Sequence, residues 1–323
     1  MFSFHPIYKE MIWGGTDILP FKGLPEDTRL IGESWELSHV DHNFSIVNNN
    51  NPTGITIDDL IKKHGVQLLG KKAIQQSGHI FPLLIKFIDA RDNLSIQVHP
   101  NDQLAQLRHQ SFGKTEMWYV VKASPDAALF SGFSKQIDAD EYVQRVADNS
   151  IMEVLQKYNV KAGDVFFLPA GRIHAIGAGC FIAEIQQTSN ITYRIYDYNR
   201  KDVNGQSREL HTDLAKDAID YSVCPDYQTH YNPVVNETVQ LVQCPYFTTN
   251  LLHLNQTKQR DFSSIDSFVI YICIQGYAQL KNDKGDTLPM RQGQTILIPA
   301  DTKNLTIIPE PSAQFLETYL SCI

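Results

Sequence analysis

Short apolar runs recur along most of the chain and are separated by Gly, Asn, Asp and Pro. They are rich in Val, Ile, Phe and Tyr, which favour strands, and such spacing is typical of β-sandwiches and barrels. The pattern therefore predicts a mainly β fold. Representative runs are Val165–Leu168, Phe181–Ile185, Leu251–Leu254, Phe268–Ile274, Thr295–Ile298 and Leu305–Ile308.

Three segments predict helices instead, at about 56–70, 138–158 and 212–222. In the first, Thr56 stands three residues before Asp59 in the manner of a capping box, and Gly65 is a candidate stop. The second is expected to be the longest, because apolar residues follow one helical face at Ile151, Val154, Leu155 and Tyr158. We therefore expect a β framework with a few helical insertions.

One sequence unit occurs twice, at 163–174 and 293–304. Each copy has a glycine, an apolar run, a proline and a polar residue five positions after the proline. The glycine suits a turn, and the proline ends the strand because it has no N–H to donate. The repeat predicts two similar β domains, which we place at 1–235 and 236–323. The last polar residue is His174 in the first copy and Asn304 in the second, so only the first is equipped for metal chemistry.

Composition narrows the class of protein. The chain has 323 residues, of which 42% are hydrophobic and 20% charged, as in ordinary globular proteins. The net charge is −8 and no run of Lys or Arg is dense, which argues against nucleic acid and membrane surfaces as partners. Five scattered cysteines, and no pattern of a signal peptide or transmembrane span, predict a cytoplasmic protein.

Four residues form a candidate metal site. Gln97 and His99 are two positions apart, so on a strand both side chains project from one face. Glu116 begins another apolar run, and His174 closes the first copy of the repeat. An amide oxygen, two imidazoles and a carboxylate suit zinc, and Fe(II), Mn or Co could also occupy such a site.

Each of these residues also has a structural interpretation. A buried strand histidine is more often a hydrogen-bonded core residue than a ligand. Gln97 alone would be an edge or surface residue, and Glu116 could simply pair with Lys114. The combination of same-face spacing, a glycine- and proline-framed histidine and a β-rich chain favours the metal site.

The residues resemble a known family. The frame at 163–174 resembles the second cupin motif, and Gln97-x-His99 followed by Glu116 resembles the first, with Gln replacing the usual first His. With Gln in that position, the motif resembles the one found in the type I mannose-6-phosphate isomerases. Longer strings agree with this family at 82–90, 94–102, 113–120, 171–177 and 184–197, with weaker similarity at 13–15 and 32–36.

The resemblance implies two cupin-like β-barrel (jelly-roll) domains, the first catalytic and the second degenerate. It implies one Zn²⁺ per chain, held by Gln97, His99, Glu116 and His174, and it makes Arg194 the catalytic arginine. Longer members of the family carry a large helical insertion between the glutamate ligand and the second histidine. The short stretch here indicates the compact bacterial form.

The implied reaction interconverts mannose 6-phosphate and fructose 6-phosphate through a cis-enediol. Lys114 is a candidate proton-transfer base, with Glu184 and metal-bound water as rivals. Arg172 and Glu184 are candidate substrate contacts, and Arg194 could instead be a strand residue paired with Asp197. Arg200 and Lys201 are further phosphate candidates.

Two rival classes fit the same pattern. A metal-dependent cupin oxygenase would normally have more histidines in its site, and Gln97 argues against it. A non-enzymatic sugar-phosphate-binding cupin would not need a complete metal set together with Arg194. The expected partner is a small sugar phosphate, with no nucleic acid and no membrane, and the chain is expected to be a monomer or homodimer.

Overall fold

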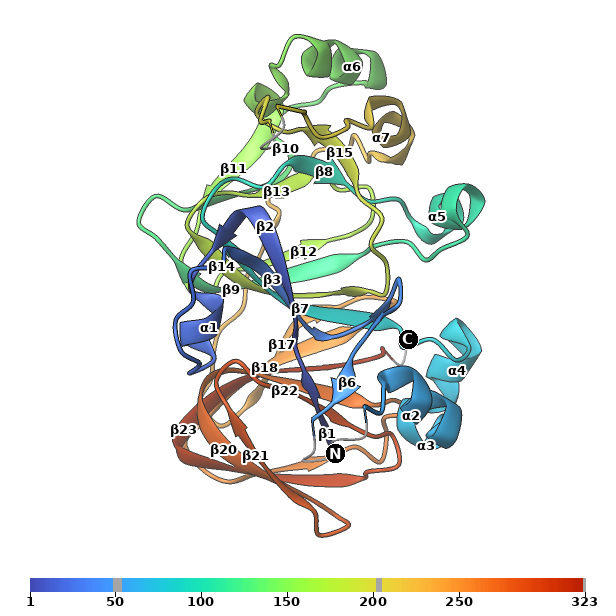
Figure 1. Ribbon diagram of the computed structural model, residues 1–323, viewed down its shortest axis with the longest axis vertical. Helices are drawn as coiled ribbons and strands as arrows, with labels where there is room; N and C mark the ends of the chain where they lie inside the picture. Colours follow the sequence, from blue (N-terminus) through green and yellow to red (C-terminus); the bar gives the residue numbers. More distant parts are fainter. Residues whose placement is uncertain (49–53, 202–204, 322–323) are drawn as a thin grey trace.

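The strands of the protein form stacked antiparallel layers in a computed structural model that describes residues 1–48, 54–201 and 205–321 (Figure 1). Helices α6 (Ala139–Ala147) and α7 (Thr212–Ala218) lie at one end of the stack. Two sheets from the first two thirds of the chain follow, and the sheet built mostly from the C-terminal third lies at the other end. The prediction of a mainly β protein with helical insertions is confirmed.

Two facing sheets enclose the interior of the N-terminal part. The five-stranded sheet has the order β11 (Leu155–Asn159), β10 (Ala128–Phe133), β13 (His174–Ile176), β8 (Ile96–Val98) and β15 (Tyr193–Tyr196). The seven-stranded sheet has the order β16 (Gln228–Thr229), β12 (Val165–Leu168), β9 (Glu116–Ala123), β14 (Cys180–Gln187), β7 (Leu83–Ala90), β2 (Ile7–Gly15) and β3 (Ile31–Leu37). One apolar core, which includes Trp13, Ile88, Trp118 and Ile176, draws on both sheets. The two sheets thus form a filled β-barrel.

The third sheet combines the C-terminal third with the first strand of the chain. Along its main path lie β17 (Thr238–Gln243), β18 (Thr248–Leu254), β23 (Asn304–Tyr319), β20 (Val269–Asn282), β22 (Thr295–Ile298), β1 (Phe2–His5) and β6 (Ile46–Val47). Strand β19 (Lys258–Asp261) pairs with β23, and β21 (Thr287–Arg291) pairs with β20. A small hairpin joins β4 (His39–Val40) to β5 (Asn43–Phe44). The N-terminus is therefore anchored in the C-terminal sheet.

The helices are short and lie at the margins of the sheets. Besides α6 and α7 they are α1 (Ile18–Phe21), α2 (Ile57–His64), α3 (Val66–Leu69), α4 (Lys71–Ser77), α5 (Asp102–His109) and the 3₁₀ turn η1 (Ile151–Val154). The expected capping box is present, since the Thr56 hydroxyl accepts from the Asp59 N–H and the Asp59 carboxylate accepts from the Thr56 N–H. Gly65, at φ 45°, separates α2 from α3. No helix in the described residues is long and apolar enough to cross a membrane.

The predicted helix over 138–158 is wrong in its second half. Helix α6 ends at Ala147, and Asn149 has a positive φ of 61°, which breaks the helical path. Residues 151–154 form η1, and β11 then pairs with β10. The apolar spacing at 151–158 wrongly indicated a helix, because a 3₁₀ turn also brings residues i and i+3 to one side. Leu155 is buried as a residue of the strand that follows.

The two copies of the repeated unit have the same backbone structure. Gly163 and Gly293 both occupy the positive-φ region, at 93° and 77°, and precede β12 and β22. After the strand, the carbonyl of Pro169 accepts from the Arg172 N–H, and that of Pro299 accepts from the Thr302 N–H, each at 3.0 Å. The predicted structural repeat is confirmed.

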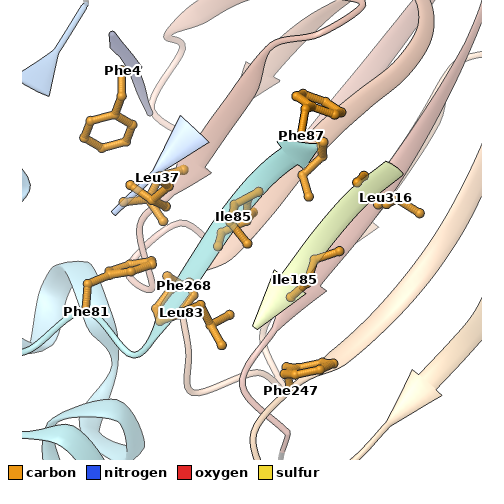
Figure 2. Close-up of a cluster of buried hydrophobic side chains, with 14 of the residues drawn as sticks. Phe4, Leu37, Phe81, Leu83, Ile85, Phe87, Ile185, Phe247, Phe268 and Leu316 are labelled. Atoms are coloured by element: carbon orange, nitrogen blue, oxygen red, sulfur yellow. The ribbon is translucent and has the colours of Figure 1, made fainter. Parts of the chain in front are cut away.

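A continuous apolar core joins the seven-stranded sheet to the C-terminal sheet (Figure 2). Leu83, Ile85 and Phe87 project from β7, and Ile185 from β14, towards Phe268 and Leu316 of the C-terminal part. All of these side chains are fully buried. Burial of a large apolar side chain stabilises a fold by about 1.5–3 kcal/mol, so this interface holds the seven-stranded sheet and the C-terminal sheet together.

The core of the C-terminal sheet contains one buried carboxylate. Glu317 on β23 accepts hydrogen bonds from Arg260 at 2.9 and 2.7 Å and from Asn250 at 3.0 Å, and the Tyr271 hydroxyl donates to it as well. The side chain is fully buried, so it depends on these donors in place of water. This network replaces apolar packing at the centre of the sheet.

Glu317→Gln should destabilise the protein by about 3 kcal/mol. The change leaves the partly buried Arg260 without a counter-charge, and the new amide N–H₂ group faces the N–H and O–H donors that the carboxylate accepted from. Urea unfolding measures the difference. Glu237→Gln is the matched control, since that exposed carboxylate lies 3.5 Å from Lys258, and its loss should cost less than about 1 kcal/mol. Equal midpoints for the two variants would contradict the role given to the network.

Candidate metal centre and active-site cleft

The five-stranded sheet places three predicted site residues in one row. In its register Gln97 on β8 pairs with His174 on β13 and with Arg194 on β15. Residues directly opposite each other on neighbouring strands direct their side chains to the same face. Gln97, His174 and Arg194 therefore present one polar row to the interior of the barrel.

The seven-stranded sheet supplies the facing row. Glu184 on β14 pairs with Lys86 on β7 and with Trp118 on β9. Glu116 lies two positions before Trp118 on the same strand, so both side chains share a face. The Trp118 indole N–H donates to Glu184 at 2.8 Å, and Lys86 Nζ lies 3.2 Å from the other Glu184 oxygen.

His99, Glu116 and His174 meet between the two rows. Their candidate ligand atoms all lie within 4.8 Å of one another, and the three side chains are almost completely buried. His99 Nε2 is 3.6 Å from one Glu116 oxygen, and His174 Nε2 is 3.3 Å from the other. Within the described chain this is the one cluster of His, Cys, Asp and Glu that could hold a metal ion.

The hydrogen bonds of the two histidines orient them towards one point. His99 Nδ1 is 2.8 Å from the Ile191 carbonyl, and His174 Nδ1 is 2.7 Å from the Arg172 carbonyl. Metal-binding histidines are characteristically fixed in this way, with the second nitrogen free. His99 Nε2 and both Glu116 oxygens are buried without a hydrogen-bond partner, so the donor set fits a cation.

Electrostatics point to the same conclusion. Burial raises the pKa of Glu116 to about 7, although Lys114 Nζ at 3.1 Å opposes this shift. Burial lowers the pKa of His174 to about 3 and brings that of His99 well below its ordinary value. The imidazoles are therefore neutral, as metal ligands must be. Gln97 Nε2 lies 3.4 Å from His174 Nε2, which places this amide at the edge of the cluster.

A cavity of about 350 Å³ opens beside the cluster. The predicted residues Gln97, Lys114, Glu184 and Arg194 line it together with Trp13. Lys86, Glu33 and Arg208 complete its charged lining. The cavity is large enough for a sugar and is rich in charged groups, so it can bind a polar, negatively charged molecule.

Arg194 occupies the part of the cavity next to Gln97. Its Nη1 donates to the Glu209 carbonyl at 2.9 Å, while its buried Nε has no hydrogen-bond partner. Burial and the nearby Arg208 lower the pKa of Arg194. The Asp197 carboxylate accepts from Arg200 and Arg208, so the alternative that Arg194 serves as its hydrogen-bonded partner is not what the structure has.

Other residues considered from the sequence lie outside this cavity. The Arg172 guanidinium stacks on the Tyr227 ring at 4.3 Å and is not among the residues that line the cleft. Arg200 Nη1 donates to the Asn93 carbonyl at 2.6 Å. Lys201 is exposed. Of these three, none is brought into the cleft lining.

Sequence reasoning missed Lys86, Glu33 and Arg208. Lys86 lies in the apolar run 81–88, and burial opposes its charge, but Glu33 and Glu184 outweigh this and raise its pKa. The Glu33 carboxylate accepts from the Trp35 indole at 2.5 Å and lies 3.5 Å from Lys86. The sequence did contain one indication of this group, a lysine inside an otherwise apolar strand, because a buried charge of this kind needs carboxylates around it.

Comparisons with protein families identify two parts of the chain. Residues 1–126 match the model of the phosphomannose isomerase type I catalytic domain. Residues 237–311 match the model of the mannose-6-phosphate isomerase cupin domain. The two matches lie on either side of the segment that supplies His174 and Arg194.

Similar proteins cover nearly the whole chain. It is 33% identical to a mannose-6-phosphate isomerase of Bacillus subtilis over 299 residues, 92% of each chain. It is 32% identical to the mannose-6-phosphate isomerase of Streptococcus mutans over 294 residues, 91% of this chain and 90% of that one. The crystal structure of a Bacillus subtilis mannose 6-phosphate isomerase superposes with a TM-score of 0.86 at 29% identity, over 98% of each chain. The chain thus belongs to the type I mannose-6-phosphate isomerases.

Proposed function

We propose that this chain interconverts mannose 6-phosphate and fructose 6-phosphate with one Zn²⁺ held by Gln97, His99, Glu116 and His174. The observation that carries the proposal is the buried His99–Glu116–His174 cluster, whose free ligand atoms converge beside a charged, sugar-sized cavity. Membership of the isomerase family gives the reaction class. Two imidazoles, one carboxylate and one amide oxygen suit zinc as they would suit Fe(II), Mn or Co, and zinc is the metal that the resemblance to the family implies.

Gln97 is the fourth proposed ligand. It neighbours His174 in the sheet register, and rotation of its amide would turn the oxygen towards the Nε2 atoms. Bound zinc would act as a Lewis acid that stabilises negative charge on the substrate oxygens. Aldose–ketose isomerisation needs this, because charge develops on O1 and O2 while the proton moves between C1 and C2.

Lys114 and Arg194 are the proposed catalytic residues. Lys114 lines the cavity with its Nζ 3.1 Å from Glu116. As an ammonium it can donate a proton to the substrate, and it can act as the base only after it has given up that proton. Arg194 pairs with Gln97 in the sheet register, and its unpartnered Nε offers a donor to an oxyanion in the same place. Both lie near the cluster and also border the open cavity.

Glu184 is proposed to act with Lys86 at the wall of the cleft. Burial opposes ionisation of Glu184, but Lys86 and Lys114 outweigh it and lower its pKa, so the group is a carboxylate. It can accept a hydrogen bond from a sugar hydroxyl while it holds Lys86. This arrangement favours substrate contact over proton abstraction for Glu184, because an ion-paired carboxylate is a weak base.

The phosphate is proposed to lie at the arginine-rich end of the cleft. Arg194 and Arg208 line this end, and Arg200 adjoins it through Asp197. Arg200 and Arg208 share the Asp197 carboxylate and Arg194 lies near both, so this end carries excess positive charge in an otherwise acidic protein. Arginine suits a phosphate because its planar fork donates two parallel hydrogen bonds. Arg172 remains a weaker candidate for substrate binding.

The wider assignments follow from the same proposal. Residues 1–235 are proposed as the catalytic cupin domain, and 236–323 as the degenerate one, in which the exposed Asn304 occupies the position of His174. The protein is proposed to be cytoplasmic, and its described cysteines Cys180, Cys224, Cys244 and Cys273 are free thiols, which a reducing compartment maintains. Cys322 lies outside the described residues. The chain is proposed to act as a monomer or homodimer.

A coupled assay tests the function directly. Conversion of mannose 6-phosphate to fructose 6-phosphate should stop after treatment with a chelator and return when zinc is added, because the site needs a cation to neutralise Glu116. Metal analysis of the active protein should give one zinc per chain. A folded, zinc-loaded protein that turns over no mannose 6-phosphate would refute the proposed reaction. Turnover that is insensitive to complete metal removal would refute the metal role.

His174→Ala should lose zinc and turnover together, with zinc affinity reduced by more than about 100-fold, because a direct ligand is removed. Zinc content after dialysis and the coupled assay measure the two losses. His230→Ala is the control, since this exposed histidine pairs with Asp226 at 2.7 Å away from the cluster. An active, metal-free His174→Ala protein would show that His174 is not a ligand.

Arg194→Ala should retain zinc but lower kcat by about 100- to 1000-fold, as expected when a donor to a developing oxyanion is removed. Arg145→Ala offers a matched loss of an arginine that pairs with Glu141 on α6 and does not line the cleft, and it should keep most of the activity. If Arg194→Ala turns over at the wild-type rate, Arg194 has only a structural role in its strand.

A further inference from the structure

The backbone that carries Lys114 and Glu116 is held by a set of partly buried hydrogen bonds. The N–H of Gly113 donates to Asp102 Oδ1 at 2.8 Å, and the N–H of Thr115 donates to Gln187 Oε1 at 2.8 Å. Between them, the Lys114 N–H donates to the Pro100 carbonyl at 3.1 Å. Three successive amides before Glu116 are thus each fixed by a partner.

Asp102 and Gln187 also hold each other. Gln187 Nε2 donates to Asp102 Oδ1 at 3.0 Å, and the Gln187 side chain is 5% exposed. A glutamine that donates to one group and accepts from another has a single amide orientation. We call the pair Asp102 and Gln187 the bracket.

The bracket and Thr115 together connect the three chain segments that carry His99, Glu116 and His174. Asp102 begins α5, three residues after His99. Thr115, next to Glu116, uses its hydroxyl to accept from the Ala170 N–H at 3.2 Å, in the turn that leads to His174. On an extended chain Lys114 and Glu116 point to one face and Thr115 to the other. The hydrogen bonds that fix Thr115 therefore set the direction of the Lys114 and Glu116 side chains, although none of these bonds lies in the cavity.

The C-terminal sheet contributes the last member. Tyr246, in the loop between β17 and β18, donates its hydroxyl to Asp102 Oδ2 at 2.6 Å. Asp102 then accepts from Gly113, Gln187 and Tyr246, with both oxygens used. One hydroxyl from the C-terminal part thereby acts on the segment that carries Lys114 and Glu116.

We propose that Asp102, Gln187 and Tyr246 are positioning residues for the isomerase reaction, and that the C-terminal sheet supports catalysis through Tyr246. The inference rests on the proposed function, because the groups it positions are the proposed base Lys114 and ligand Glu116. Outer partners of metal ligands typically change metal affinity by 10- to 100-fold. A misplacement of about 1 Å in a catalytic group can cost about 100-fold in rate.

Tyr246→Phe and Gln187→Leu test the proposal, with Tyr231→Phe as the matched control. Tyr231 is likewise a partly buried tyrosine whose hydroxyl donates a hydrogen bond, but its acceptor is the Gly163 carbonyl, at 2.7 Å, and not a residue of the bracket. Three quantities are measured for each variant. The zinc dissociation constant comes from competition with a coloured chelator, and kcat and KM are measured in the zinc-saturated protein.

Gln187→Leu should weaken zinc binding by about 10- to 100-fold and lower kcat by about 100-fold. Tyr246→Phe should lower the zinc affinity and kcat by about tenfold each. KM should be nearly unchanged in the two variants. Tyr231→Phe should change neither. Tyr246→Phe decides the question if Gln187→Leu does not fold. Wild-type zinc affinity and kcat in Tyr246→Phe would overturn the proposal. If the wild type itself has no turnover, the proposed function fails, and zinc affinity still tests the bracket.

Discussion

The structure depends on one buried carboxylate, that of Glu116, which has an ion-pair partner in Lys114 but no hydrogen-bond donor of good geometry. Glu116 is fully buried, and neither of its oxygens accepts a hydrogen bond. Lys114 approaches it at 3.1 Å, but burial still raises its pKa to about 7. Two neutral imidazoles direct free nitrogens at the same point. A carboxylate in this state is costly in an apolar barrel, and a cation between Glu116 and the two histidines removes the cost.

The barrel makes that arrangement possible because its two sheets face each other across the site. One sheet fixes Gln97 between His174 and Arg194, and the other fixes Glu184 between Lys86 and Trp118. These are strand registers, so the side chains are held by ladders of backbone hydrogen bonds and not by mobile loops. The cavity beside the site is lined by the charged groups Lys86, Arg194 and Arg208.

The C-terminal sheet carries no metal cluster among its described residues, yet many contacts join it to the rest of the chain, and three of them stand out. Strand β1 from the start of the chain pairs with β22, and the apolar core around Ile85 and Leu316 is shared. The third link is the Tyr246 hydroxyl on Asp102. The first two links provide stability. The third reaches the segment that holds the proposed base and ligand, so the position of the C-terminal sheet bears on the proposed site.

The sequence by itself determined the local features of this protein. Strand periodicity, the Thr56 capping box, the repeated glycine–proline frame and the motif spacing of Gln97, His99, Glu116 and His174 could all be read from neighbouring residues. Local patterns failed where two structures share one spacing, as at 151–158, where a 3₁₀ turn and a strand replace the predicted helix. The tertiary structure alone decided that Lys86 and Arg208 line the cleft, that Arg172 does not, and that Tyr246 meets Asp102. Those outcomes depend on which distant strands and loops become neighbours, and the packing of whole sheets, not any local preference, selects them.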